Sequence, residues 1–87
     1  MPAADSCPRL SPQVRLTYDR ARGRPVLLTP ETVTVLNGTG ASILGLCDGR
    51  RTVAEIAAEL RGQYARVDEG EIGAFLDRLT ERRVVRG

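Results

Sequence analysis

The sequence predicts an α+β domain in which an N-terminal three-stranded antiparallel sheet is followed by three α-helices. Two observations predict this order. Between residues 13 and 36, two segments with the two-residue alternation of strands flank a short apolar run, and from Asn37 onward apolar residues recur at helical spacing. Strands and helices that are segregated along the chain are typical of the α+β class. With 87 residues, the chain has room for one hydrophobic core.

The three strands are expected over residues 13–19, 25–29 and 32–36. The first shows strict alternation of apolar and polar side chains. A polar turn around Gly23 separates it from the second, a short apolar run that is typical of a central strand. The third begins with four β-branched residues, whose restricted χ1 angles disfavour a helix and favour a pleated sheet. Together these segments predict a meander.

Three helices are expected after the strands. Asn37 or Thr39 caps the first, which stops at Asp48-Gly49, and Thr52 to Glu55 form a capping box that opens the second. The third begins after Asp68. Its apolar stripe consists of Ile72, Phe75, Leu76 and Leu79. Three helices preceded by a short meander predict an arrangement like a winged helix-turn-helix.

The ends of the chain give a further set of expectations. Residues 1–11 show no periodic pattern, so we expect a flexible N-terminal segment before a domain that spans residues 12–87. The sequence contains no apolar run of membrane-spanning length, and its N-terminus lacks the basic and apolar regions of a signal peptide. We therefore expect a cytoplasmic protein with no membrane partner.

Composition argues against catalysis by this chain. All 13 basic residues are arginines, so the chain has neither a histidine, whose pKa would lie near neutrality, nor a lysine that could form a Schiff base. The acidic residues fall at helix caps or on polar helix faces. Cys7 and Cys47 lack the spacing of a zinc site, and Cys47 is expected to be a buried core residue. We expect no enzyme activity, no cofactor and no metal.

A winged-helix DNA-binding protein is the alternative interpretation. The arginines that favour it lie on and after the third helix, which would be the recognition helix, and they are Arg78, Arg82, Arg83 and Arg86. The same helix also carries Asp77 and Glu81 on its exposed face, and the formal net charge of the chain is only +2. Because phosphate-binding proteins usually carry a larger excess of positive charge, we expect no nucleic-acid partner.

The third strand is the feature that points to binding. In a meander both outer strands present unpaired N–H and C=O groups, and charged residues or prolines usually protect such edges. The first strand has this protection, whereas residues 32–36 carry no charge. Unless the third helix or the tail covers it, this edge can accept an extended peptide by β-augmentation.

Several short strings resemble the PqqD family of pyrroloquinoline quinone biosynthesis, over about residues 9 to 83. The most specific are Leu36-Asn37 before the first helix, and Asp48-Gly49 followed by Thr52-Val53-Ala54-Glu55-Ile56. The others are Val14-Arg15-Leu16, Val26-Leu27-Leu28, Pro30-Glu31 and Ile43-Leu44 with Leu46.

This resemblance implies a recognition element for a ribosomally made precursor peptide. It implies that the leader of this peptide binds as an added strand against the third strand and the third helix. It also implies a radical S-adenosylmethionine (SAM) maturase as a second partner, which cross-links a Glu and a Tyr of the peptide. The strand contacts would be Val33, Thr34, Val35 and Leu36. The helix contacts would come from Ile72, Phe75, Leu76 and Leu79, with Arg78 and Arg82 at the rim.

Two departures from the family pattern stand out. The first helix contains more glycine than the family leads us to expect, and the last turn, residues 81–85, lacks the glycine that often ends it. The sequence leaves open whether the chain forms a homodimer, including one in which Cys7 pairs between two copies.

Overall fold

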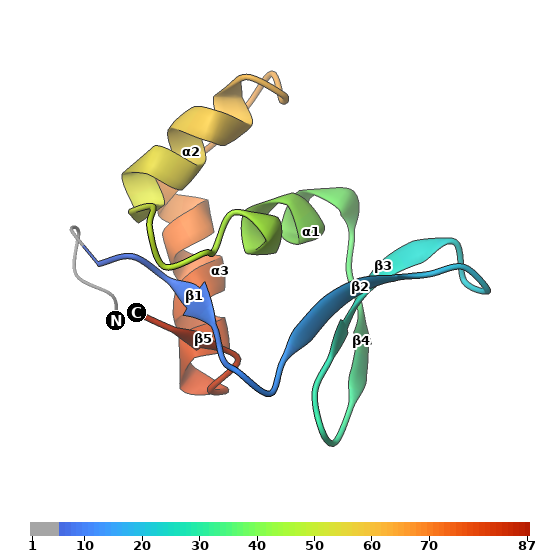
Figure 1. Cartoon of the computed structure of the whole chain (residues 1–87). Coiled ribbons are helices and arrows are strands. Elements are labelled where there is room, and N and C mark those ends of the chain that lie inside the picture. Colours follow the sequence, from blue (N-terminus) through green and yellow to red (C-terminus); the bar gives the residue numbers. More distant parts are fainter. Residues whose placement is uncertain (1–5) are drawn as a thin grey trace.

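The computed structural model describes residues 6–87 and has the expected α+β architecture. The sheet projects to one side of the helices, and α1 lies between the sheet and the other two helices (Figure 1). The elements in chain order are β1 (Arg9–Leu10), β2 (Arg15–Asp19), β3 (Arg24–Leu28), β4 (Val33–Val35), α1 (Gly38–Gly45), α2 (Val53–Arg61), α3 (Glu69–Glu81) and β5 (Val85–Arg86).

The main sheet is the predicted antiparallel meander, with strand order β2-β3-β4. Each of the three expected strands is present within one or two residues of its predicted bounds. Gly23 has a φ of 65° in the β2–β3 turn, where Asp19 accepts hydrogen bonds from the backbone N–H groups of Ala21 and Arg22. The central strand β3 is the most buried of the three, and β4 is an outer strand.

Residues 1–11 were expected to form a flexible segment, and the structure corrects this expectation for residues 8–11. Residues 1–5 lie outside the described residues. Arg9 and Leu10 form β1, which pairs antiparallel with β5 and so joins the two ends of the chain. Pro8 is fully buried, and Ser11 donates hydrogen bonds through its N–H to the Val84 carbonyl and through its Oγ to the Arg83 carbonyl. The ordered domain therefore begins before residue 12.

Each helix begins at a side-chain cap that the sequence predicts. Asn37, rather than Thr39, caps α1 and accepts from the N–H of Gly40 at 2.7 Å. Thr52 and Glu55 form the reciprocal capping box of α2, and Asp68 caps α3. These bonds satisfy backbone donors that a helix N-terminus otherwise leaves unpaired.

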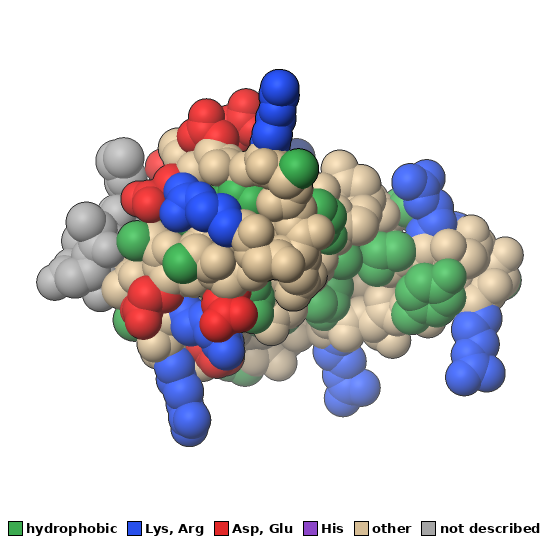
Figure 2. Space-filling model, turned by 90° about the horizontal axis from the view of Figure 1, so that it is seen from above, with side chains coloured by type: hydrophobic (Ala, Val, Ile, Leu, Met, Phe, Trp, Pro, Cys, Tyr) green, Lys and Arg blue, Asp and Glu red, His purple; other side chains and the backbone are tan. Residues whose placement is uncertain are grey.

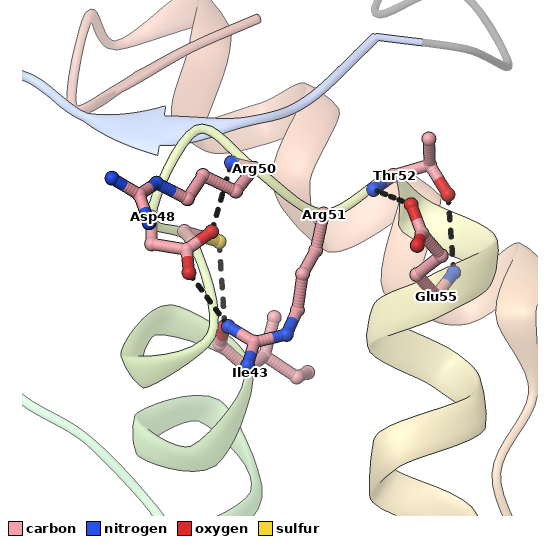
Figure 3. A network of polar contacts seen from close by, with 7 residues as sticks. Ile43, Asp48, Arg50, Arg51, Thr52 and Glu55 are labelled. Atoms are coloured by element: carbon pink, nitrogen blue, oxygen red, sulfur yellow. Dashed lines mark hydrogen bonds and ion pairs between the residues drawn. The ribbon is translucent and has the colours of Figure 1, made fainter.

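The connection between α1 and α2 is held by a local polar network (Figure 3). Asp48 accepts from the backbone N–H of Arg50 at 2.9 Å and from the Arg51 guanidinium at 2.7 Å. The backbone bond and the nearby arginines lower the pKa of the Asp48 carboxyl group. The pKa of Glu55 is lowered by its bonds to Thr52. This network sets the turn from one helix to the next.

The core lies where the three helices meet the inner face of the sheet. Its largest fully buried side chains include Leu44, Ile56, Leu60 and Leu76, one or two from each helix. Cys47 is only 6% exposed and packs in this core, which confirms its prediction as a buried residue. Burial raises the pKa of the Cys47 thiol to about 12, so the thiolate is disfavoured.

The end of α3 explains one departure from the family pattern. The N–H of Arg83 donates to the Thr80 carbonyl, and the N–H of Val84 donates to the Leu79 carbonyl, as in a Schellman motif. Arg83 has a φ of 63° at the position where this motif favours glycine. The turn thus forms without glycine, at the energetic cost of holding the Arg83 backbone in the left-handed region.

We expect the substitution Arg83→Gly to raise the free energy of unfolding by about 1 kcal/mol, because glycine adopts a positive φ without the clash of a Cβ atom. Urea denaturation measures this change. Arg82→Gly is the matched control and should destabilise the domain, since Arg82 has a φ of −84°. Equal effects of the two substitutions would contradict this account of the turn.

Within the part of the chain that the structure describes, no helix combines the length and the apolar character needed to cross a membrane.

Candidate functional site

The outer edge of β4 exposes main-chain hydrogen-bonding groups. The N–H of Leu36 donates to the Pro25 carbonyl at 2.9 Å, and the N–H of Thr29 donates to the Thr32 carbonyl at 3.0 Å. Bonded and non-bonded pairs alternate in an antiparallel ladder, so the backbone of Thr34 faces its partner Leu27 in β3. The N–H and C=O groups of Val33 and Val35 therefore point away from the sheet. No strand among residues 6–87 pairs with this edge.

The same register separates the side chains of β4 onto two faces. Thr34 lies opposite Leu27, which belongs to the core, so its side chain is on the face toward the helices. Val33 and Val35 lie opposite Leu28 and Val26 on the other face, and they are 53% and 43% exposed. A strand added beside β4 would gain apolar neighbours on this outer face.

A groove of about 1140 Å³ runs between β4 and α3. Thr34, Val35 and Leu36 line it on the strand side. On the helix side it is lined by Phe75, Arg78, Leu79 and Arg82. The structure therefore brings together seven of the ten residues that the family resemblance implied as peptide contacts, although these residues lie in two segments about forty positions apart.

The remaining three predicted residues lie elsewhere. Leu76 is fully buried in the core and does not line the groove, which corrects its expected role as a contact. Ile72 is also a core residue and lines a second, smaller cavity rather than the groove. Val33 is exposed on the outer face of the sheet and does not line the groove, although its backbone faces the open edge.

The N-terminal segment also lines the groove, which sequence reasoning missed. Ser11, Gln13 and Val14 contribute to it near the C-terminal end of α3. Ser11 is held there by its two hydrogen bonds to the chain just after α3. The alternating pattern that includes Val14 was visible in the sequence, but its position beside α3 depends on the pairing of β1 with β5.

The charges around the groove are nearly balanced. Arg78, Arg82 and Arg83 lie on the helix side, with Glu31 and Glu81 also in the lining. On the face seen in Figure 2, acidic side chains and arginines lie together over the helical end, whereas the charged side chains that project from the sheet end are basic. Such a groove can bind by main-chain hydrogen bonds and apolar contact, with a mild preference for acidic groups.

These features define a class of small α+β domains in which a three-stranded antiparallel sheet precedes three helices and keeps one strand edge open beside a helix. The family model described as Coenzyme PQQ synthesis protein D (PqqD) matches residues 25–85. The chain belongs to the PqqD family, as its sequence resemblance implied.

Similar sequences occur in several bacteria. The chain is 40% identical over 79 residues to a PqqA binding protein of Pseudomonas aeruginosa, covering 88% of this chain and 86% of that protein. It is 38% identical over 85 residues to a PqqA binding protein of Xanthomonas axonopodis pv. citri, covering 94% and 92%. It is also 39% identical over 82 residues to the bifunctional coenzyme PQQ synthesis protein C/D of Methylorubrum extorquens, covering 90% of this chain and 22% of that longer protein.

Two solved structures share the fold. The NMR structure of the PqqD truncation of Methylobacterium extorquens PqqCD, described as a stand-alone recognition element for ribosomally synthesised and modified peptides (RiPPs), matches with a TM-score of 0.78 and 35% identity. The match covers 100% of this chain and 96% of that one. The heterocyclase TruD matches with a TM-score of 0.63 and 24% identity over 92% of this chain and 11% of its own, which shows a shared fold only.

Proposed function

We propose that this chain binds the PqqA precursor peptide as an added β-strand along the outer edge of β4. The observation that carries the proposal is the pair of outward-facing backbones at Val33 and Val35. Val35 also lines the groove whose other wall is α3. The relatives named PqqA binding proteins support the choice of peptide. Main-chain hydrogen bonds would supply affinity, and the groove would select side chains.

The added strand would continue the alternation of the sheet. Peptide residues opposite Thr34 would point their side chains into the groove, toward Phe75 and Leu79. Residues opposite Val33 and Val35 would cover these exposed valines on the outer face. The peptide would thus bury apolar surface on both faces of the sheet, which favours binding.

We further propose that the chain acts without catalysis, in the cytoplasm, and presents the bound peptide to a radical SAM maturase. The absence of His and Lys from the sequence favours an adaptor over an enzyme. The single serine in the groove lining, Ser11, uses its hydroxyl group to bond the Arg83 carbonyl. In Methylorubrum extorquens a similar sequence forms part of a bifunctional synthesis protein, which fits a domain that works beside enzymes of the same pathway.

Titration of the ¹⁵N-labelled chain with PqqA peptide and with duplex DNA, at 50 and 200 mM salt, tests this function. We expect PqqA to shift the resonances of residues 32–36 and the groove face of α3, with less than about threefold loss of affinity at the higher salt, because the contacts are mainly backbone and apolar. A DNA-binding protein with 6–10 phosphate contacts would lose about 10³- to 10⁵-fold over this range. DNA binding with such a slope, and no PqqA binding, would contradict the proposal.

A further inference from the structure

A second cavity of about 360 Å³ lies between the first turn of α1, the α2–α3 connection and the N-terminal half of α3. Its lining includes the core residues Ile43, Leu60 and Ile72 from the three helices. Half-buried Val67 and Phe75 add further apolar surface. The cavity is at the lower end of the range of about 300–1,000 Å³ that is typical of ligand pockets, so it suits one large side chain or a small group.

This cavity joins the groove beside β4. Asn37, Gly40, Phe75 and Arg78 line both hollows. A Cβ atom at Gly40 would lie 3.6 Å from the Phe75 ring and 3.1 Å from the capping oxygen of Asn37, so glycine lets helix and ring approach closely at the junction. A chain that leaves the groove past Leu36 reaches the second cavity directly.

The rim of the second cavity favours an uncharged occupant. Its lining contains two arginines, Arg66 and Arg78, and two acidic residues, Asp68 and Glu71, so the formal charges balance. Asp68 is already engaged, since it accepts from the N–H groups of Gly70 and Glu71 as the cap of α3. The apolar lining below this balanced rim suits an aliphatic or aromatic side chain.

The direction of the added strand decides which part of the peptide reaches this cavity. The sheet is antiparallel throughout, and antiparallel pairing is slightly more stable per residue than parallel pairing. An added strand antiparallel to β4 has its N-terminal end beside Leu36, where β4 leads into α1. The residues that precede the paired segment would then lie over the junction at Gly40 and Phe75.

We propose that the second cavity is an anchor subsite for a large apolar side chain of the bound peptide, located just before the segment that pairs with β4. This inference rests on the proposed function and adds to it a second determinant of specificity. Backbone pairing accepts many sequences, whereas an apolar hollow at a fixed distance from the strand favours one kind of side chain at one position of the peptide.

The substitution Ala74→Trp tests the subsite, because Ala74 is exposed on α3 and lines the second cavity but not the groove. The indole should occupy the cavity and weaken PqqA binding about tenfold, the effect of losing one buried apolar side chain. Ala58→Trp, at an exposed position of α2 outside both hollows, is the matched control and should bind as the wild type does. Binding by Ala74→Trp within twofold of the wild type would overturn the proposal.

Two further experiments distinguish a failure of this inference from a failure of the proposed function. The apolar residues of PqqA that precede the paired segment are replaced by alanine one at a time. One of these substitutions should weaken binding to the wild type about tenfold but change binding to Ala74→Trp little, whereas additive losses for every substitution would contradict a shared site. In the unsubstituted protein, PqqA should shift the NMR resonances of the Val67 methyl groups. If PqqA shifts the backbone resonances of residues 32–36 but not those of the Val67 methyl groups, the subsite is wrong and strand addition remains supported. No PqqA binding by the wild type would overturn both.

Discussion

The substitution Val35→Pro should weaken PqqA binding about 10- to 100-fold while leaving the domain folded. The N–H of Val35 points away from β3, so proline removes a donor that the sheet itself does not use. A peptide carbonyl would then be buried without its partner, at a cost of about 1–3 kcal/mol. Isothermal titration calorimetry with PqqA measures the change.

Tyr18→Pro is the matched control on the opposite edge of the sheet. Tyr18 is an exposed residue of β2 that pairs with Pro25, and by the same alternation its N–H faces outward. Both substitutions therefore remove an outward donor from an outer strand. Equal losses of affinity would mean that the effect is not specific to β4, and unchanged affinity in a folded Val35→Pro variant would contradict strand addition.

The largest expected effect on stability is that of Leu76→Ala, which should lower the free energy of unfolding by about 2–5 kcal/mol. Leu76 is fully buried among core residues of the other helices, so its truncation leaves a cavity. The stability of a domain is only on the order of 5–15 kcal/mol, so part of the population could unfold at 37 °C. Thermal and urea denaturation measure this loss.

Leu79→Ala is the informative comparison, one turn further along α3. Leu79 is partly buried and lines the groove, so its truncation should cost less stability and should weaken PqqA binding instead. A stability loss below about 1 kcal/mol for Leu76→Ala would contradict its assignment to the core. If Leu76→Ala lowers the affinity of the folded protein for PqqA more than Leu79→Ala does, Leu76 contacts the peptide after all.

The strands and helices of this domain are largely encoded in local sequence patterns. Alternation predicts the first and third strands and an apolar run predicts the second, while the caps at Thr52 and Asp68 fix where two helices begin. The small β1–β5 sheet could not be predicted in this way. Each of its strands has two residues, too few to show a period, and their pairing joins segments at opposite ends of the chain.

The candidate site was less accessible to sequence reasoning than the fold. The apolar stripe of α3 predicts which side chains are removed from solvent. It does not distinguish core residues from groove residues, because both are apolar and recur at helical spacing. Leu76 and Phe75 are neighbours in this stripe, yet Leu76 lies in the core and Phe75 lines both hollows. Only the packing of α3 against the other helices separates these roles.

Hydrogen exchange of single backbone amides in the PqqA complex tests strand addition at β4 most directly. In the free protein the amides of Val33 and Val35 have no partner in the sheet, whereas that of Thr34 faces β3. Binding should slow the exchange of the Val33 and Val35 amides strongly, with little change at Leu16 and Tyr18 on the opposite edge. A tight complex in which the Val33 and Val35 amides exchange as fast as in the free protein would contradict strand addition.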